Sequence, residues 1–146
     1  MFESIRIAPA SAKPSAAVIG IFTDKKLDAA GTALDKAYGG IVRAAIDRPE
    51  CTGESGRLVE AYPSGAAAGD KHGLTRIIIA GLGKKDDFKE HTLRTVAAAV
   101  GRRLATTKDT TVSIQLAGQV TSGKRVKAAQ AGRCVATRRA SGPTRY

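Results

Sequence analysis

The segment RIIIAG, residues 76–81, constrains the fold more than any other part of the chain. Its three consecutive isoleucines are β-branched, and such side chains favour strands. The run is short and free of polar interruptions, which is typical of a strand buried on both faces. A second run, AAVIGIF at residues 16–22, has the same character. We therefore expect central strands that are covered by other elements on both sides.

A helix is predicted after the second run, because four apolar residues recur there at helical spacing: Leu27, Ala30, Leu34 and Tyr38. Asp28 stands at its start and Gly39-Gly40 at its end, positions at which these residue types cap helices. Residues 41–46, IVRAAI, predict a further short helical turn that ends before Pro49.

The strongest helical pattern lies in the third quarter of the chain. One continuous apolar stripe is formed there by Leu93, Val96, Ala97, Val100 and Leu104. Asp87 and Glu90 have the spacing of a capping box, in which each side chain satisfies a backbone N–H at the helix start. We therefore expect this helix to begin at Asp87.

Three further segments alternate or cluster apolar residues in the manner of strands: residues 4–9, 57–62 and 110–118. The predicted order along the chain is β-β-α-α-β-β-α-β. This order is typical of an α/β sandwich. A length of 146 residues fits one domain of ordinary size.

The loop Gly81-Leu82-Gly83-Lys84-Lys85 has two interpretations. Walker-type phosphate loops read G-x-x-x-x-G-K-[ST] and dinucleotide loops read G-x-G-x-x-G, and the loop matches neither. Asp86 and Asp87 follow directly, and their charge would repel a phosphate where an anion site needs bare N–H groups. The favoured interpretation is a structural turn, with these aspartates complementing the helix dipole.

Candidate reactive residues are few. Cys51 and Cys134 form no CxxC pair, so we expect free thiols in a reducing compartment. His72 and His91 stand in no metal-ligand spacing, and a solvated histidine is the expectation for each. No stretch approaches the ~20 apolar residues of a membrane span, and the N-terminus lacks a secretory signal pattern. We expect a cytoplasmic protein without membrane contact.

The net charge of +11 is unevenly distributed. Residues 1–120 hold 17 Lys and Arg against 13 Asp and Glu, whereas residues 121–146 hold seven Lys and Arg and no acidic residue. We therefore divide the chain into a domain at 1–120 and a basic tail at 121–146. The tail has two large aliphatic residues, too few to order it alone. One loose basic helix around residues 124–137 is the most order expected of it.

Several stretches of the chain are similar to one known family. FTDKKLDAAGTALDKAYGG, TGESGRLVEAYP, RIIIAGLGKKDDF and LRTVAAAVGRRL resemble, in this order, the N-terminal domain of leucyl aminopeptidases, also called cytosol aminopeptidases. The resemblance spans about residues 16 to 118. It implies a macro-like domain: a three-layer α/β/α sandwich with a mixed sheet between helix layers.

The resemblance also implies a division of labour. The family's N-terminal domain is not catalytic and contributes to assembly of a hexamer. The C-terminal domain binds two divalent metals, zinc or manganese, and hydrolyses the first peptide bond of a peptide by two-metal water activation. The expected partners of this chain are that catalytic domain and sister subunits. Some bacterial members also bind DNA through the N-terminal region.

The chain departs from the family where the chemistry resides. The family's metal-binding stretch, N-T-D-A-E-G-R, has no counterpart here, and the lone histidines and scattered acids form no donor cluster. No catalytic, metal or cofactor-binding residue is therefore assigned, and the chain alone is expected to be inactive. We interpret the abrupt change of composition after residue 120 as a truncated or frame-disrupted product. Reading the other frames of the coding DNA beyond Val120 tests this interpretation.

Two alternative functions follow from other features. The basic tail could neutralise phosphates and make the chain a nucleic-acid-binding module, although no aromatic residues interleave its charges before Tyr146. The macro-like fold could bind ADP-ribose or another phosphorylated ligand, a reading that only the loop at residues 81–85 supports.

Overall fold

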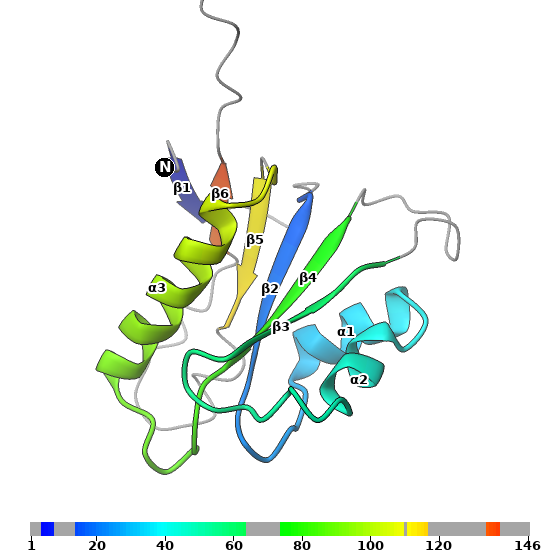
Figure 1. Ribbon diagram of the computed structural model, residues 1–146. Coiled ribbons are helices and arrows are strands. Elements are labelled where there is room, and N and C mark those ends of the chain that lie inside the picture. Colours follow the sequence, from blue (N-terminus) through cyan, green and yellow to red (C-terminus); the bar gives the residue numbers. More distant parts are fainter. Residues whose placement is uncertain (1–3, 8–13, 64–73, 110, 117–133, 138–146) are drawn as a thin grey trace, which may run out of the picture.

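A computed structural model describes residues 4–7, 14–63, 74–109, 111–116 and 134–137 of the chain. These residues form a mixed sheet with helices on both of its faces (Figure 1). The elements, in chain order, are β1 (Ser4–Ile7), β2 (Ala16–Ile21), α1 (Ala29–Ala37), α2 (Ile41–Ile46), β3 (Leu58–Ala61), β4 (Arg76–Gly81), α3 (Glu90–Ala105), β5 (Thr111–Gln115) and β6 (Cys134–Thr137).

The described sheet has six strands in the order β1-β6-β5-β2-β4-β3. Strand β2 lies in the centre and is parallel to both β4 and β5. Strand β3 is antiparallel to β4, and β6 is antiparallel to β5 and to β1. The predicted α/β class with a mixed sheet is confirmed; the macro-like resemblance stays a prediction.

Two separate cores lie on the two faces of this sheet, because successive residues of a strand point to opposite sides. On one face, Ile19 and Ile79 pack with Val42 and Ile46 of α2. On the other, Val18, Ile78 and Val112 pack with residues of α3, among them Val96, Val100 and Leu104. Residues 16–19, 21 and 77–80 are all buried. The two apolar runs are therefore covered on both faces, as their sequences predict.

Helix α1 begins as predicted. Asp28 is its N-cap residue, and the carboxylate Oδ1 accepts a hydrogen bond from the Gly31 N–H at 2.7 Å. The helix ends before Gly39 and Gly40, which both have positive φ angles. Gly40 is the N-cap of α2, so the glycine pair turns the chain from one helix into the next.

Helix α3 begins later than predicted. Its N-cap residue is Lys89, and the Lys89 N–H donates to the Thr92 hydroxyl oxygen at 3.3 Å. The prediction of a capping box formed by Asp87 and Glu90 is therefore wrong, since Glu90 is the first helical residue and Asp87 lies in the preceding turn. A threonine at the third helical position supplies the acceptor that the prediction assigned to an acid.

The buried stripe of α3 also differs in part from the prediction. Val96, Val100 and Leu104 are buried, but Ala97 is exposed and Leu93 is only partly buried. Thr92 continues the buried row at a spacing of four residues. Exposing the small Ala97 side chain to solvent costs little free energy, so a prediction based on hydrophobicity alone placed this residue wrongly in the buried stripe.

Residues 134–137 form strand β6 rather than the end of a basic helix, so the predicted helix around residues 124–137 is wrong at that end. The backbone of β6 is paired on both sides, to β5 and to β1. Residues 117–133 and 138–146, which hold the rest of the predicted tail, lie outside the described residues. The proposed boundary at residue 120 stays a prediction.

Candidate functional site

The loop after β4 uses its backbone donors within the fold. The Gly81 N–H donates to the Arg57 carbonyl, the Leu82 N–H to the Ile21 carbonyl and the Gly83 N–H to the Gly53 carbonyl, each at 2.8 Å. A phosphate cradle needs several such N–H groups pointing at the anion. Because these three are already bonded, the geometry favours the structural turn over the phosphate loop.

The glycines of this loop have a structural reason. Gly83 has a φ angle of +81°, a conformation that side chains with a Cβ rarely adopt. The segment around Gly53 and Glu54 crosses directly over Gly81, leaving no room there for a side chain. The loop is therefore shaped by the close passage of two chain segments.

Of the four cysteines and histidines of the chain, Cys51 and His91 have side chains that the structure describes. Cys51 is a buried free thiol, and burial raises its pKa while the positive charge of Lys25 acts in the opposite direction. His91 is exposed, as expected of a solvated histidine. The side chains of Cys134 and His72 lie outside the part of the chain that is described. Within that part, no group of three or more His, Cys, Asp or Glu residues could hold a metal ion.

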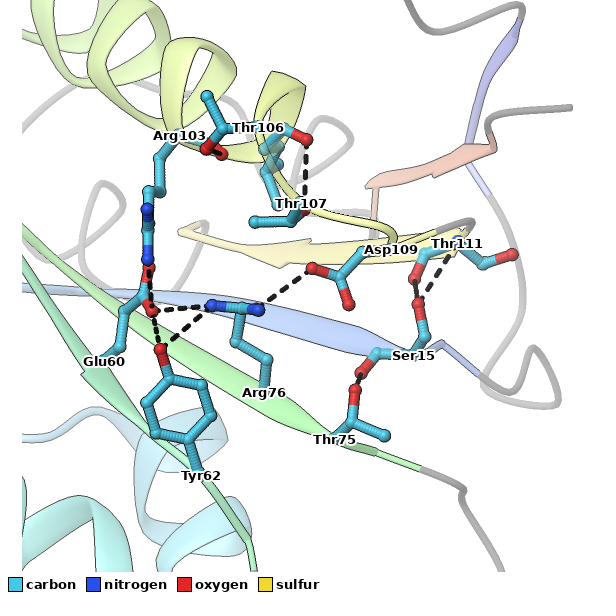
Figure 2. A network of polar contacts seen from close by, with 11 residues as sticks. Ser15, Glu60, Tyr62, Thr75, Arg76, Arg103, Thr106, Thr107, Asp109 and Thr111 are labelled. Atoms are coloured by element: carbon cyan, nitrogen blue, oxygen red, sulfur yellow. Dashed lines mark hydrogen bonds and ion pairs between the residues drawn. The ribbon is translucent and has the colours of Figure 1, made fainter. Parts of the chain in front are cut away.

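The structure instead gathers five polar residues that sequence reasoning did not select. They are Glu60, Tyr62, Arg76, Arg103 and Asp109, and Figure 2 shows their side chains converging from β3 and the residue that follows it, from β4 and α3, and from the segment before β5. We call this set the arginine network. All five lie on the α3 side of the sheet, where they border the core beneath that helix.

Arg76 is the centre of the arginine network. Its Nη1 donates to Glu60 Oε2 at 2.6 Å and to the Tyr62 hydroxyl at 3.1 Å, and its Nε donates to Asp109 Oδ2 at 3.0 Å. Arg103, on α3, also donates to Glu60: its Nε donates to Oε1, and its Nη2 donates to Oε2 at 3.0 Å. The Tyr62 hydroxyl also donates to Glu60.

These contacts fix the charge state of the arginine network. The hydrogen bond from Arg103, more than any other contact, lowers the pKa of Glu60 to about 2; burial opposes this, and Tyr62 and Arg76 reinforce it. The same hydrogen bond raises the pKa of the Arg103 guanidinium. Glu60 is thus ionised at neutral pH with its oxygens already engaged. Such a carboxylate is poorly suited to act as a general base, which needs a pKa near the working pH.

A second row of polar contacts runs along the same edge of the sheet (Figure 2). The Thr75 N–H donates to the Ser15 carbonyl at 2.8 Å, and the Ser15 N–H donates to the Thr111 carbonyl at 2.9 Å. The Ser15 and Thr75 hydroxyls add bonds of 3.0 Å each. These hydrogen bonds tie together the starts of β2, β4 and β5.

One sequence signal could have found the arginine network. In the strand RLVEAY, alternation places Glu60 on the same side as Leu58, which is packed against a core. A carboxylate on a covered face needs a cationic partner. Which arginine supplies it is not visible in the sequence, because the partners lie 16 and 43 residues away.

None of the described helices is long and apolar enough to cross a membrane.

Comparison with known proteins gives a consistent picture. A sequence model described as "Cytosol aminopeptidase family, N-terminal domain" matches residues 18–140.

Three curated relatives, each called "Probable cytosol aminopeptidase", illustrate the similarity. The protein of Thioalkalivibrio sulfidiphilus is 32% identical over 94 residues, which cover 64% of this chain and 18% of the relative. That of Aromatoleum aromaticum is 28% identical over 116 residues, or 80% and 22%. That of Cyanothece sp. is 34% identical over 99 residues, or 67% and 19%. The chain spans about a fifth of the length of the curated relatives it matches.

Proposed function

The chain belongs to the cytosol aminopeptidase family, whose N-terminal domain it represents, and we propose that it serves as a non-catalytic scaffold and assembly domain. The observation that carries the proposal is the match itself, because it covers residues 18–140 and belongs to the N-terminal domain of the family. About four fifths of each similar relative lies outside the aligned segment. We assign the peptide hydrolysis of the family to that other part.

The electrostatics of the described residues support this role. In the arginine network, the two carboxylates and the two guanidinium groups form ion pairs with one another. Its charges therefore hold β3, β4 and α3 in place instead of facing a substrate. The pKa of Glu60, about 2, keeps that carboxylate from exchanging protons near neutral pH.

The metals expected of the family are assigned to the remainder of the enzyme. Two zinc or manganese ions would need a cluster of carboxylate and imidazole donors. The described residues offer no group of three such donors, so no step of the hydrolysis is given to this chain. Its proposed partners are the catalytic domain and sister subunits of a cytoplasmic hexamer.

An activity assay tests the proposal. The purified chain is incubated with leucine amide and manganese or zinc, beside the intact Aromatoleum aromaticum relative as a positive control. We expect no release of leucine by the chain above a mock preparation. Release that requires the metal and stops on addition of a chelator would overturn the scaffold role.

Nucleic-acid binding is a second candidate, favoured by the seven Lys and Arg residues and no acidic residue at positions 121–146. Such a charge block gives sequence-independent affinity that falls steeply with salt. A gel shift at two salt concentrations, with the full chain and with residues 121–146 deleted, tests it. Equal binding by both would remove the tail as the cause.

A macro-type binder of ADP-ribose is a third candidate. Its support was the loop at residues 81–85, whose N–H groups at 81, 82 and 83 are bonded to other carbonyls. Calorimetric titration with ADP-ribose tests it directly. We expect no heat of binding; a saturable titration would reverse this expectation.

A further inference from the structure

We propose that Tyr62 is the anchor through which this domain docks against the segment that follows it in cytosol aminopeptidases. The inference rests on the proposed scaffold function and gives it a specific contact surface. Three observations support the inference. Tyr62 is exposed, its ring is contacted by residues of the arginine network, and it lies at the end of the sheet where Thr137 also lies.

Tyr62 is unusual among the described residues. Tyr62 is 54% exposed, whereas the other large apolar residues in the ranges 14–63, 74–109 and 111–116 are buried or partly buried. Tyrosine and arginine are over-represented among the residues that dominate binding at protein interfaces, because they combine a large contact area with polar groups. An exposed tyrosine beside two arginines is therefore a candidate interface centre.

The Tyr62 ring is also held in one position. The Arg76 guanidinium carbon lies 5.1 Å from the ring centroid, within the range of a cation–π contact. The hydroxyl is bonded to both Glu60 and Arg76 (Figure 2). A side chain that is already ordered loses little conformational entropy when a partner covers it. The arginine network therefore prepares the ring for binding.

The position of the anchor indicates which partner covers it. Arg76 is the first residue of β4 and Thr111 the first of β5, so the arginine network lies at the edge where these parallel strands begin. Strand β6 runs antiparallel to β5 and pairs Thr137 with Thr111. Residue 137, three residues before the end of the family match, thus lies at the same edge. Because the matched model describes the N-terminal domain and its match ends at residue 140, we infer that the following segment of the family begins near this edge.

The distance along this edge is short. Four strand spacings separate β6 from β3 in the sheet order, or about 19 Å at ~4.8 Å per spacing. A segment that follows the matched region is consequently tethered near Tyr62, because Thr137, the last described residue, lies at this edge of the sheet. Tethering at such range gives the attached segment a high effective concentration at this surface, so even a weak interaction would keep the two bound. The geometry therefore favours the segment that follows the matched region, rather than a separate protein, as the partner that binds over Tyr62.

The chemistry of the surface defines its counterpart. Two carboxylates and two guanidinium groups compensate one another, so the surface carries no strong net charge to select a highly charged partner. The exposed ring face and the Arg103 side chain, which is 45% exposed, fit an aliphatic or proline-containing surface with a hydrogen-bond acceptor at its border.

A chimera tests the inference. Residues 1–140 of this chain are joined to the segment that follows the matched region in the Aromatoleum aromaticum relative. Hydroxyl-radical labelling then compares Tyr62 in the chimera with Tyr62 in the chain alone. We expect its oxidation rate to fall several-fold in the chimera. His91, which is exposed at the opposite end of α3, is the internal control and should react equally in both.

A variant adds a functional reading. In the chimera, Tyr62→Ala should make limited proteolysis at the junction about tenfold faster, the effect expected when a central interface residue is truncated. Tyr62→Phe keeps the ring and its contact with Arg76 but loses the hydrogen bonds of the hydroxyl, so its cleavage rate should lie between those of the unaltered chimera and Tyr62→Ala. Arg94→Ala, on the exposed side of α3, is the matched control and should change nothing.

Equal oxidation of Tyr62 in the chimera and in the chain alone would overturn the inference. So would protection that appears in the chain alone as its concentration rises, which would assign the surface to a second copy. A chimera that does not hydrolyse leucine amide also counts against it, since docked segments should assemble an active enzyme. A separate result would contradict the scaffold proposal: hydrolysis of leucine amide by the chain alone.

Discussion

The carbonyl oxygen of Glu54 occupies the place where a side chain on Gly81 would stand. A Cβ built on Gly81 overlaps this oxygen and the neighbouring carbonyl carbons of Gly53 and Glu54. The crossing segment is fixed in turn, because the Gly56 N–H donates to the Gly81 carbonyl at 3.1 Å. The glycine that ends β4 is thus required by the approach of another backbone.

The first prediction follows from this contact. Gly81→Ala should lower the free energy of unfolding by roughly 3 kcal/mol or more, because backbone atoms on both sides must move to admit the methyl group. Urea denaturation monitored by circular dichroism measures the effect. Gly101→Ala is the matched control: a Cβ at Gly101 in α3 meets nothing within 4 Å. It should stabilise the domain by about 0.5–1 kcal/mol. Equal effects of the two variants would contradict the crossing.

The second prediction concerns the pH dependence of the arginine network. The pKa of Glu60 is about 2 in the folded chain, below its ordinary value of 4.5. A carboxylate with a lowered pKa contributes stability that is present above its unfolded pKa and is lost as pH falls toward the folded one. The stabilisation by Glu60 should therefore disappear between about pH 4.5 and pH 2.

Glu60→Gln isolates this contribution. At pH 7 the variant should lose roughly 1–3 kcal/mol, since Arg76 and Arg103 both lose an ionised acceptor. The difference from the unaltered chain should shrink as pH falls from 4.5 toward 2, measured by thermal unfolding at a series of pH values. Glu90→Gln is the control, because Glu90 and Arg94 are both at least 80% exposed. A pH-independent difference at Glu60 would refute the assignment.

The third prediction concerns the start of α1. Asp28→Ala removes the acceptor for the Gly31 N–H and should cost about 1 kcal/mol, whereas Asp28→Ser retains an acceptor and should cost less. Chemical denaturation measures both. Asp47→Ala is the control, because Asp47 lies at the C-terminal end of α2, where a negative charge is unfavourable. A loss at Asp47 as large as that at Asp28 would exclude capping as the cause.

The fourth prediction uses the reactivity of Cys51. Its thiol is 3% exposed and its pKa is raised by burial. In a Cys134→Ser variant, which leaves one thiol, labelling with iodoacetamide near neutral pH should be slow in the folded protein and fast in urea, because the thiolate is the reactive species. The ratio of the two rates is the measurement. Equally fast labelling in both conditions would show that Cys51 is accessible.

The sequence predicts the elements that depend on local patterns. The apolar runs of β2 and β4 identify central strands because a strand covered on both faces tolerates few polar residues. Asp28 marks the start of α1 because its capping bond spans three residues. The same local reasoning wrongly placed the start of α3 at Asp87. The N-cap residue is Lys89, because Thr92, inside the helix, accepts the hydrogen bond from the Lys89 N–H.

The features that escaped prediction join distant parts of the chain. Glu60, Arg76 and Arg103 meet only because β3 pairs with β4 and α3 packs across them. Strand β6 was missed because its residues, CVAT, have no strong pattern of their own. Their strand conformation depends on pairing with β5 and β1, which tertiary structure supplies.

The place of β6 between β1 and β5 bears on how the polypeptide matures during translation. Strand β1 is synthesised before the other described strands, and its partner β6 lies at residues 134–137. Until those residues appear, β1 must wait outside the sheet while β2, β4 and β5 can already assemble. Among the described strands, the border formed by β1 and β6 is therefore completed last, because these two are the first and the last of them to be synthesised.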